Sequence, residues 1–253
     1  MTLEAAELRE VRPSTPHLLL VTQKEPTQQL YRSIGFLEYD EAQYAFYYLR
    51  SAIAASWFRP LPGFSQVYRR YVSTELFPLF RERVPSSRRD DFRSTMRLLG
   101  LPQDAGPFEV LARSGGHRTG DSIELIPVPT VDPDGFVSFT FFSHGVRYMT
   151  EDAQNRIANL RAGELLELVP ELTNPVNPHA MLVTEHGRLS LGYVPDPLVD
   201  LVADISSRPH ALTVERANGS DVPFHFRLMV RLAGRVDPRQ PAPFTGLAWQ
   251  PVD

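Results

Sequence analysis

The chain has 253 residues, of which 42% are hydrophobic and 22% are charged, with a formal net charge of −4 and no cysteine. This length allows one large core or two modest ones. The lack of cysteine excludes disulfides and thiolate metal sites. The negative charge argues against sequence-blind coating of DNA but leaves a local basic patch open. Without an export leader or an 18-residue apolar run, the sequence predicts a cytoplasmic protein that does not span a membrane.

Residues 1–135 are expected to form an N-terminal mixed α+β domain of unknown role. Residues 1–16 are polar and proline-bearing, and they are expected to be disordered. An apolar strand is expected over 18–22, followed by a hairpin of residues 31–37 and 44–49. The runs Gly-Phe-Leu at 35–37 and Tyr-Ala-Phe-Tyr-Tyr at 44–48 resemble the N-terminal subdomain of HipA-type kinases, but no kinase residue accompanies them.

A basic stretch follows in the same domain, around an expected helix that starts at Asp90 or Asp91 and ends at Leu99 before Gly100. Its arginines outnumber its acidic residues: they are Arg81, Arg83, Arg88, Arg89, Arg93 and Arg97, against Glu82, Asp90 and Asp91. One interpretation is a face that contacts phosphates. The other, which is more common, is a solvated helix whose charges pair at i,i+3 and i,i+4.

Residues 111–121 form a second candidate for chemistry, because adjacent glycines allow backbone N–H groups to turn toward an anion. The residues of this predicted anion-binding loop are Arg113, Ser114, Gly115, Gly116 and Arg118. The segment lacks the Gly-Lys-Ser/Thr of a Walker A loop and follows a helix, so a nucleotide site is not expected. The alternative is a plain connection into a strand over 123–128. An acidic, proline-bearing stretch at 129–135 is the expected domain boundary.

The elements over 139–205 are sharply marked. An apolar strand ends at His144-Gly145, and Thr150 caps a helix that Gly163 is expected to end. A buried strand is expected over 165–169. Two Asn-Pro pairs then make the loop at 171–180 rigid, because proline restricts both itself and the residue before it. Strands over 180–184 and 189–194 are expected to pair, and a helix is expected to begin at Asp196-Pro197.

Four motifs within this stretch occur in a fixed order. They are Gly-Val-Arg-Tyr at 145–148, G-x-x-L-x-L-x-x-E at 163–171, N-P-x-x-P-x-A at 174–180 and Gly-Tyr-Val-Pro at 192–195. In this order and spacing, about half of the chain resembles a HIRAN domain, which occurs alone in bacteria and attached to fork-remodelling ATPases. The resemblance implies a small OB-like β-barrel with two helices over residues 136–253, ending in a proline-rich tail. The predicted fold class is therefore α+β.

The resemblance also implies a nucleic-acid site, since HIRAN domains of the remodelling ATPases hold a single-stranded DNA 3′ end. Arg147 and Tyr148 stand where an Arg-Tyr pair contacts the terminal nucleotides. Val176 and Asn177 replace a Tyr-Asp pair whose carboxylate takes the 3′ hydroxyl, so the charged acceptor is lost. Tyr193 replaces a histidine and can stack on a base, whereas Asp196 replaces a lysine and repels phosphate.

Two further candidates come from the expected hairpin of 212–217 and 224–232. Strand alternation places Arg227 and Arg231 on one face, opposite the apolar residues of the strand. A basic face of this kind suits a groove that tracks a nucleic-acid strand, although exposed strand faces are also commonly charged for solubility.

We therefore expect a non-catalytic DNA-binding protein that holds single-stranded or end-frayed DNA, serving DNA repair or defence against mobile DNA. The alternative is a protein-interaction or scaffold module whose barrel has lost nucleic-acid binding. An enzyme is not expected, because no catalytic triad, His-rich metal spacing or paired carboxylates stand out, and no ATPase motif is present. No cofactor and no metal are expected, and the protein partners are not predicted.

Overall fold

The computed structural model describes residues 17–118, 120, 122–237, 239 and 243–251. The disorder expected for residues 1–16 lies outside the described residues. The chain divides into two compact units: an N-terminal one that runs to Val128 and also includes the tail from Pro243, and a C-terminal one that begins at Pro129. The division thus falls at the start of the acidic, proline-bearing stretch rather than at its end. Both units contain helices and an antiparallel sheet, which agrees with the α+β class.

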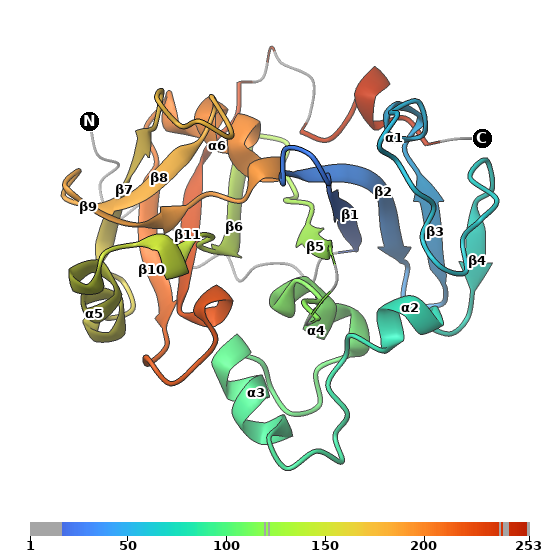
Figure 1. Cartoon of the computed structure of the whole chain (residues 1–253), viewed down its shortest axis with the longest axis horizontal. Coiled ribbons are helices and arrows are strands. Elements are labelled where there is room, and N and C mark those ends of the chain that lie inside the picture. Colours follow the sequence, from blue (N-terminus) through green and yellow to red (C-terminus); the bar gives the residue numbers. More distant parts are fainter. Residues whose placement is uncertain (1–16, 119, 121, 238, 240–242, 252–253) are drawn as a thin grey trace. The chain divides into compact units, whose positions relative to one another are not determined.

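The N-terminal unit contains a five-stranded sheet in the order β4-β3-β2-β1-β5 (Figure 1). The core of this unit lies on β3, where aromatic side chains pack together. The Phe46 ring lies 4.5 Å from the Phe64 ring and 4.9 Å from the Tyr48 ring, measured between ring centroids. The strands are β1 (Leu18–Lys24), β2 (Tyr31–Tyr39), β3 (Tyr44–Tyr48), β4 (Tyr71–Ser73) and β5 (Ile123–Pro127). The helices are α1 (Arg50–Ile53), α2 (Pro78–Arg81), α3 (Phe92–Leu99) and α4 (Pro107–Ser114).

The C-terminal tail packs on this first unit, which corrects its expected place beside the barrel. Trp249, in the 3₁₀ helix η4 (Leu247–Trp249), lies 6.0 Å from Phe36 of β2 between ring centroids. The Ser51 hydroxyl of α1 donates a hydrogen bond of 2.7 Å to the Ala248 carbonyl. The tail joins the first unit because these aromatic and polar partners lie on β2 and α1, and composition could not show this.

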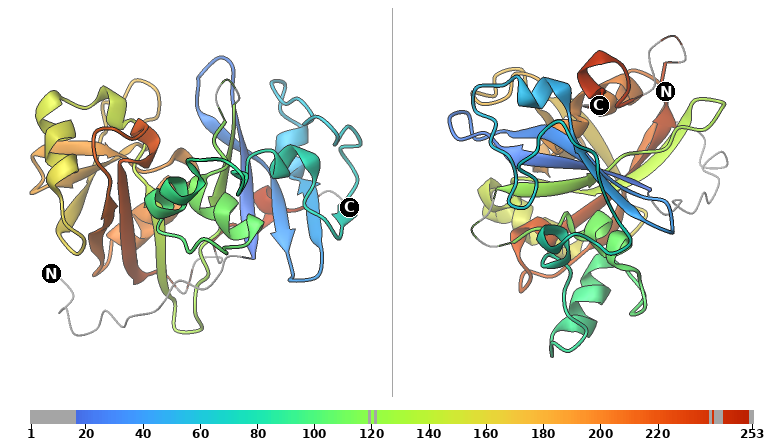
Figure 2. Two further views of the ribbon diagram at one scale, coloured as in Figure 1. Left: turned by 90° about the horizontal axis from the view of Figure 1, so that it is seen from below. Right: turned by 90° about the vertical axis from the view of Figure 1, so that its right-hand side faces the viewer.

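The C-terminal unit contains a six-stranded antiparallel sheet in the order β6-β11-β10-β7-β8-β9 (Figures 1 and 2). Its strands are β6 (Phe136–Phe142), β7 (Leu165–Pro170), β8 (Met181–Glu185), β9 (Leu189–Tyr193), β10 (Ala211–Ala217) and β11 (Leu228–Arg235). The edge strands meet just beyond β6, where His144 and Tyr193 exchange two backbone hydrogen bonds of 2.8 Å. In the described residues the edges pair through this single bridge rather than along a continuous ladder, so the sheet is strongly curled without being a fully closed barrel.

Two α-helices and three 3₁₀ helices complete the C-terminal unit. They are η1 (Val146–Tyr148), α5 (Glu151–Asn159), η2 (Asp196–Leu198), α6 (Val199–Ser206) and η3 (Phe224–Phe226). The Thr150 hydroxyl accepts a hydrogen bond of 3.2 Å from the Ala153 N–H, so it caps α5 as expected. The Val199, Leu201, Val202 and Ile205 side chains bury one face of α6.

Three local expectations were wrong. The α5 helix ends at Asn159 rather than at Gly163, because Leu160 is already extended. The β7 strand is not buried along its length, since only Leu166 is, and its alternate residues face outward as in a sheet with one packed face. The last strand begins at Leu228 and not at Phe224, because Pro223 leads into the 3₁₀ turn of η3. Among the helices of the described residues, none is long and apolar enough to span a bilayer.

Candidate nucleic-acid interface

Gly145 positions the predicted Arg-Tyr pair. It has a φ of +68°, a backbone conformation that glycine adopts at little cost, and it turns the chain from the end of β6 into η1. A Cβ atom at this position would lie 2.9 Å from Cδ2 of Tyr193. Glycine is therefore required here for two reasons, the positive φ and the lack of room for a Cβ atom. The close approach sets η1 directly against the Tyr193 ring of β9.

Arg147 and Tyr148 are both exposed on η1. The Tyr148 side chain is 77% exposed, an unusual degree for an aromatic residue. The Arg147 guanidinium lies 5.3 Å from the centre of the Tyr148 ring, within the range of a cation–π contact. Within the described part of the chain, Arg147 forms no ion pair. The pair thus presents a flat aromatic face with a positive charge beside it, which is the chemistry that stacks a base and contacts its phosphate.

The loop at 171–180, which its two Asn-Pro pairs predict to be rigid, contains several side-chain hydrogen bonds. The Asn174 side-chain oxygen accepts hydrogen bonds of 2.9 Å from the N–H groups of Val176 and Asn177. Asn177 in turn accepts from the His179 N–H at 3.0 Å and donates from Nδ2 to the Asp196 carboxylate at 2.9 Å. Both the oxygen and the nitrogen of the Asn177 amide are therefore hydrogen-bonded within the protein. The bond to Asp196 connects the loop to the start of η2.

Tyr193 joins this loop to η1. Burial raises the pKa of its phenol, and a hydrogen bond to Glu171 raises that pKa further. The hydroxyl therefore points to the loop while the ring packs against Gly145, and the side chain is half-buried. The structure thus brings the sequence-predicted residues Arg147, Tyr148, Asn177 and Tyr193 into one region, with Tyr193 as a support behind η1. Val176 lies exposed on the same loop, next to the engaged Asn177.

The other two predicted arginines do not form a basic strand face. Arg227 is only 8% exposed and donates hydrogen bonds to the carbonyls of Val222 at 3.2 Å and Ser220 at 2.7 Å. Arg231 is bound to Glu215 at 2.9 Å. The expected face is absent because Arg227 precedes β11 and because Met229, which lies between the two arginines in the sequence, is buried.

Sequence reasoning missed Phe224 as a surface residue. Its side chain is exposed, and the Arg227 guanidinium lies 3.9 Å from the centre of its ring. The η3 helix that carries it contacts η1, the helix of Arg147 and Tyr148. The signal that could have found it is Pro223, which interrupts the strand pattern at this point.

In the N-terminal unit, the predicted anion-binding loop is closed by its own side chains. Arg113 and Ser114 belong to α4, and Gly115 and Gly116 follow with φ of +68° and +60°. The Ser114 hydroxyl accepts a hydrogen bond of 3.1 Å from the Gly116 N–H that an anion would need. Positions 119 and 121 of the predicted loop lie outside the described residues.

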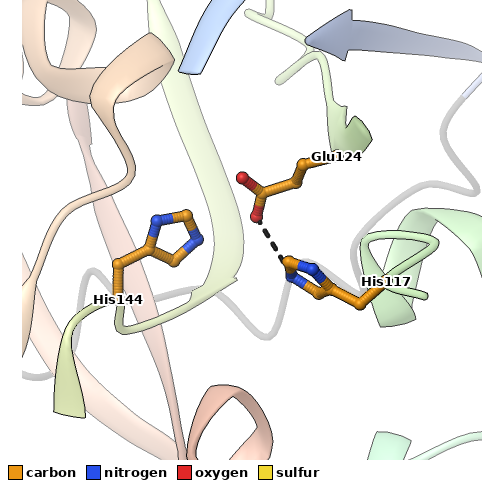
Figure 3. A group of neighbouring side chains, drawn as sticks. All are labelled: His117, Glu124 and His144. Carbon is orange, nitrogen blue, oxygen red and sulfur yellow. Dashed lines mark ion pairs between the residues drawn. The ribbon is translucent and has the colours of Figure 1, made fainter. Parts of the chain in front are cut away.

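Charged side chains of the same loop are also paired. Arg118 binds Glu82 at 2.6 Å. His117 Nε2 lies 3.3 Å from an oxygen of the buried Glu124 carboxylate on β5 (Figure 3). The segment therefore works as a tightly held connection between α4 and β5, which was the alternative left open by the sequence.

No protein-family model and no curated protein matches the chain. Two solved structures are similar to part of it. One is a protein from Lactobacillus plantarum, at 20% identity and a TM-score of 0.31, with 41% of this chain and 100% of that chain covered. The other is the HIRAN domain of human HLTF, at 15% identity and a TM-score of 0.30, with 42% of this chain and 84% of that chain covered. The second is a domain of the family that residues 145–195 resemble, and at these TM-scores the argument for that resemblance rests on the motif residues.

Proposed function

We propose that the C-terminal unit is a HIRAN-like, non-catalytic module that binds single-stranded or end-frayed DNA. The observation that carries the proposal is the exposed Tyr148 ring with the Arg147 guanidinium beside it. A monomeric surface gains nothing for its own stability by leaving such a ring in water, whereas a base can stack on it. DNA repair and defence against mobile DNA are processes that such a module would serve.

The surface around Tyr148 limits how many phosphates can be held. Arg147 supports one contact, while Arg227 and Arg231 are bound within the protein. Asp196 places a carboxylate near the loop and disfavours phosphate there. With Arg147 as one contact and any others supplied by arginines outside this surface, we expect weak, salt-sensitive binding with roughly two to four phosphate contacts per complex.

The hydrogen bonds that the Asn177 amide already forms affect whether this surface can recognise a DNA 3′ end. Its oxygen already accepts from the His179 N–H, and its nitrogen already donates to Asp196. It brings no charge, and hydrogen bonds to charged groups contribute more than those to neutral groups. We therefore propose single-strand affinity with little preference between a 3′ hydroxyl and a 3′ phosphate.

A salt titration of fluorescence anisotropy with a single-stranded oligonucleotide tests the proposal. Two to four contacts predict a slope of about −1.4 to −2.8 in a plot of log K against log salt concentration, at about 0.7 per phosphate for single strands. A duplex and an RNA of the same sequence serve as comparison ligands. No binding at low salt, or binding without a slope, would contradict the proposal.

A protein-interaction module is the second candidate function. Leu172 and Val176 are exposed apolar side chains on the rigid loop, and the Glu171 and Asp196 carboxylates lie beside them. An apolar and acidic surface suits a basic protein segment better than a phosphate backbone. If no oligonucleotide binds, this second function becomes the leading one.

A further inference from the structure

The region around α3 in the N-terminal unit carries arginines that lack acidic partners. The side chains of Arg88, Arg93 and Arg97 are exposed, and none of the three forms an ion pair with the described residues. Several other arginines of this unit are paired with carboxylates, whereas Arg50, Arg59 and Arg69 also lack an ion pair among the described residues. Arg81 pairs with Glu75 at 3.1 Å, Arg89 with Asp91 at 2.8 Å and Arg118 with Glu82 at 2.6 Å. We call Arg88, Arg93 and Arg97 the α3 arginine set.

The helix presents two of these charges on one side. Arg93 and Arg97 are four residues apart, so they are neighbours on the helix surface about one turn apart. Met96 and Leu99 are buried on the inner side of the helix, where α3 contacts α4. Figures 1 and 2 show α3 standing away from the strands of its own unit, attached through the segment that leads to α4. The two guanidinium groups can therefore reach a ligand without moving the core.

This arrangement is unfavourable for the helix itself. Like charges at i,i+4 repel, and Arg93 lies in the first turn, where the helix dipole favours acidic residues. Asp91 precedes the helix but does not cap it, because both of its carboxylate oxygens are bound to Arg89 at 2.8 Å. The ion pairs that would make this a solvated, self-compensated helix are thus missing at Arg93 and Arg97. The uncompensated charge calls for an anionic partner.

We propose that the α3 arginine set is a second nucleic-acid contact, which binds the phosphate backbone without reading sequence. Phosphate fits because arginine pairs with it through two N–H groups, and because a nucleic-acid backbone offers a row of successive negative charges. An acidic protein segment is the competing partner. The proposal rests on α3 alone and does not depend on the surface around Tyr148.

The test compares two double variants of the full chain that remove the same charge. Arg93→Gln with Arg97→Gln removes the proposed contacts, and Arg81→Gln with Arg118→Gln removes two paired arginines of the same unit. Anisotropy with a single-stranded oligonucleotide is measured across salt. The first variant is expected to reduce the magnitude of the log–log slope by about 1.4 and to weaken binding about 25-fold at about 0.1 M salt, at 0.7 log units per phosphate. The control variant is expected to keep the slope of the unaltered chain.

A second variant keeps the test independent of the helix. Arg88→Gln lies before α3, so it cannot unfold the helix, and it is expected to reduce the slope by about 0.7. Thermal unfolding of each variant checks that the fold is retained. If neither the double variant nor Arg88→Gln differs from the control, the proposal is overturned. It is also overturned if the variants lose affinity for a polyglutamate peptide but not for DNA, which would identify an acidic protein as the partner.

Combination with Tyr148→Ala separates this inference from the proposed function. If Tyr148→Ala has no effect while the α3 variants reduce the slope, the module around Tyr148 is refuted and the α3 contact stands. The reverse result refutes the α3 contact alone. Losses that add in free energy in the triple variant are expected if the two surfaces bind without sharing a contact.

Discussion

Removing the Tyr148 ring tests the proposed interface at its centre. Stacking of a base on an aromatic side chain contributes about 1 to 3 kcal/mol. In the unbound protein the ring already faces the Arg147 guanidinium, at 5.3 Å, and an exposed contact of this kind is worth about 0.5 to 1 kcal/mol. A base that displaces the guanidinium from the ring therefore gains only the stacking energy minus the energy of the lost cation–π contact. We therefore expect Tyr148→Ala to weaken single-strand binding by about 0.5 to 2 kcal/mol, which is about 2-fold to 30-fold.

The structure also supplies the control. Tyr68 of the N-terminal unit is 69% exposed, close to the 77% of Tyr148, so Tyr68→Ala removes a similar ring from a similar environment. Both substitutions are expected to change the free energy of unfolding by no more than about 1 kcal/mol, because the rings are on the surface and Tyr148→Ala removes only the exposed contact with Arg147. Tyr148→Phe keeps the stacking face and is expected to bind like the unaltered chain. The assay is anisotropy of a labelled single-stranded oligonucleotide at low salt. Equal affinities for Tyr148→Ala and Tyr68→Ala would refute the reasoning, and would mean that Arg147 and Tyr148 only form the corner between β6 and α5.

Four further outcomes are expected. Gly145→Ala should lower the stability of the C-terminal unit by about 1 to 2 kcal/mol, because an L-residue at φ +68° is strained and its Cβ would press on Tyr193, and thermal unfolding measures this. Arg227→Gln should lower the melting temperature more than Arg231→Gln, because only Arg227 is buried and donates to backbone carbonyls, those of Val222 and Ser220; equal shifts would contradict that assignment. Oligonucleotides ending in a 3′ hydroxyl or a 3′ phosphate should bind within about 3-fold of one another, about 0.7 kcal/mol, and strong discrimination would show a charged acceptor at the end pocket. Arg239 and Arg208 lower the pKa of Asp237 to about 2, below its unfolded value of about 3.9. The stability that this carboxylate contributes is therefore present above about pH 4 and is lost as the pH falls toward about 2. Asp237→Asn should remove that part of the acid dependence of unfolding.

Short-range signals determined most of the secondary structure. Thr150 predicts the start of α5 because its hydroxyl satisfies a backbone N–H, and the turn at His186-Gly187 follows from residues that adopt positive φ. The alternating runs at 31–37 and 44–49 became β2 and β3, and Gly100 ends α3 in the left-handed conformation. Where local rules competed, the prediction failed. Pro223 outweighed the alternation of residues 224–232, and Leu160 ended α5 before the glycine that was expected to do so.

The motif order also determined which residues to examine at the candidate interface, since Arg147, Tyr148 and the Asn-Pro loop are contiguous in short segments. Their relation to one another is a tertiary property. Only the packing of Gly145 on the Tyr193 ring sets η1 beside β9, and only the bond from Asn177 to Asp196 shows that the amide is already used. Pairing partners separated by many residues cannot be read from periodicity, which is local.

The arginines illustrate this division most clearly. In the sequence, Arg227, Arg231, Arg93 and Arg97 are equally good candidates for phosphate contacts, because composition and spacing do not show which carboxylates lie nearby. The tertiary structure buries Arg227 against backbone carbonyls and pairs Arg231 with Glu215 across the β10–β11 ladder. It leaves Arg93 and Arg97 exposed on α3 without an ion pair among the described residues. Charge is a property of the sequence, but its neutralisation depends on distances of a few ångströms that only the fold sets.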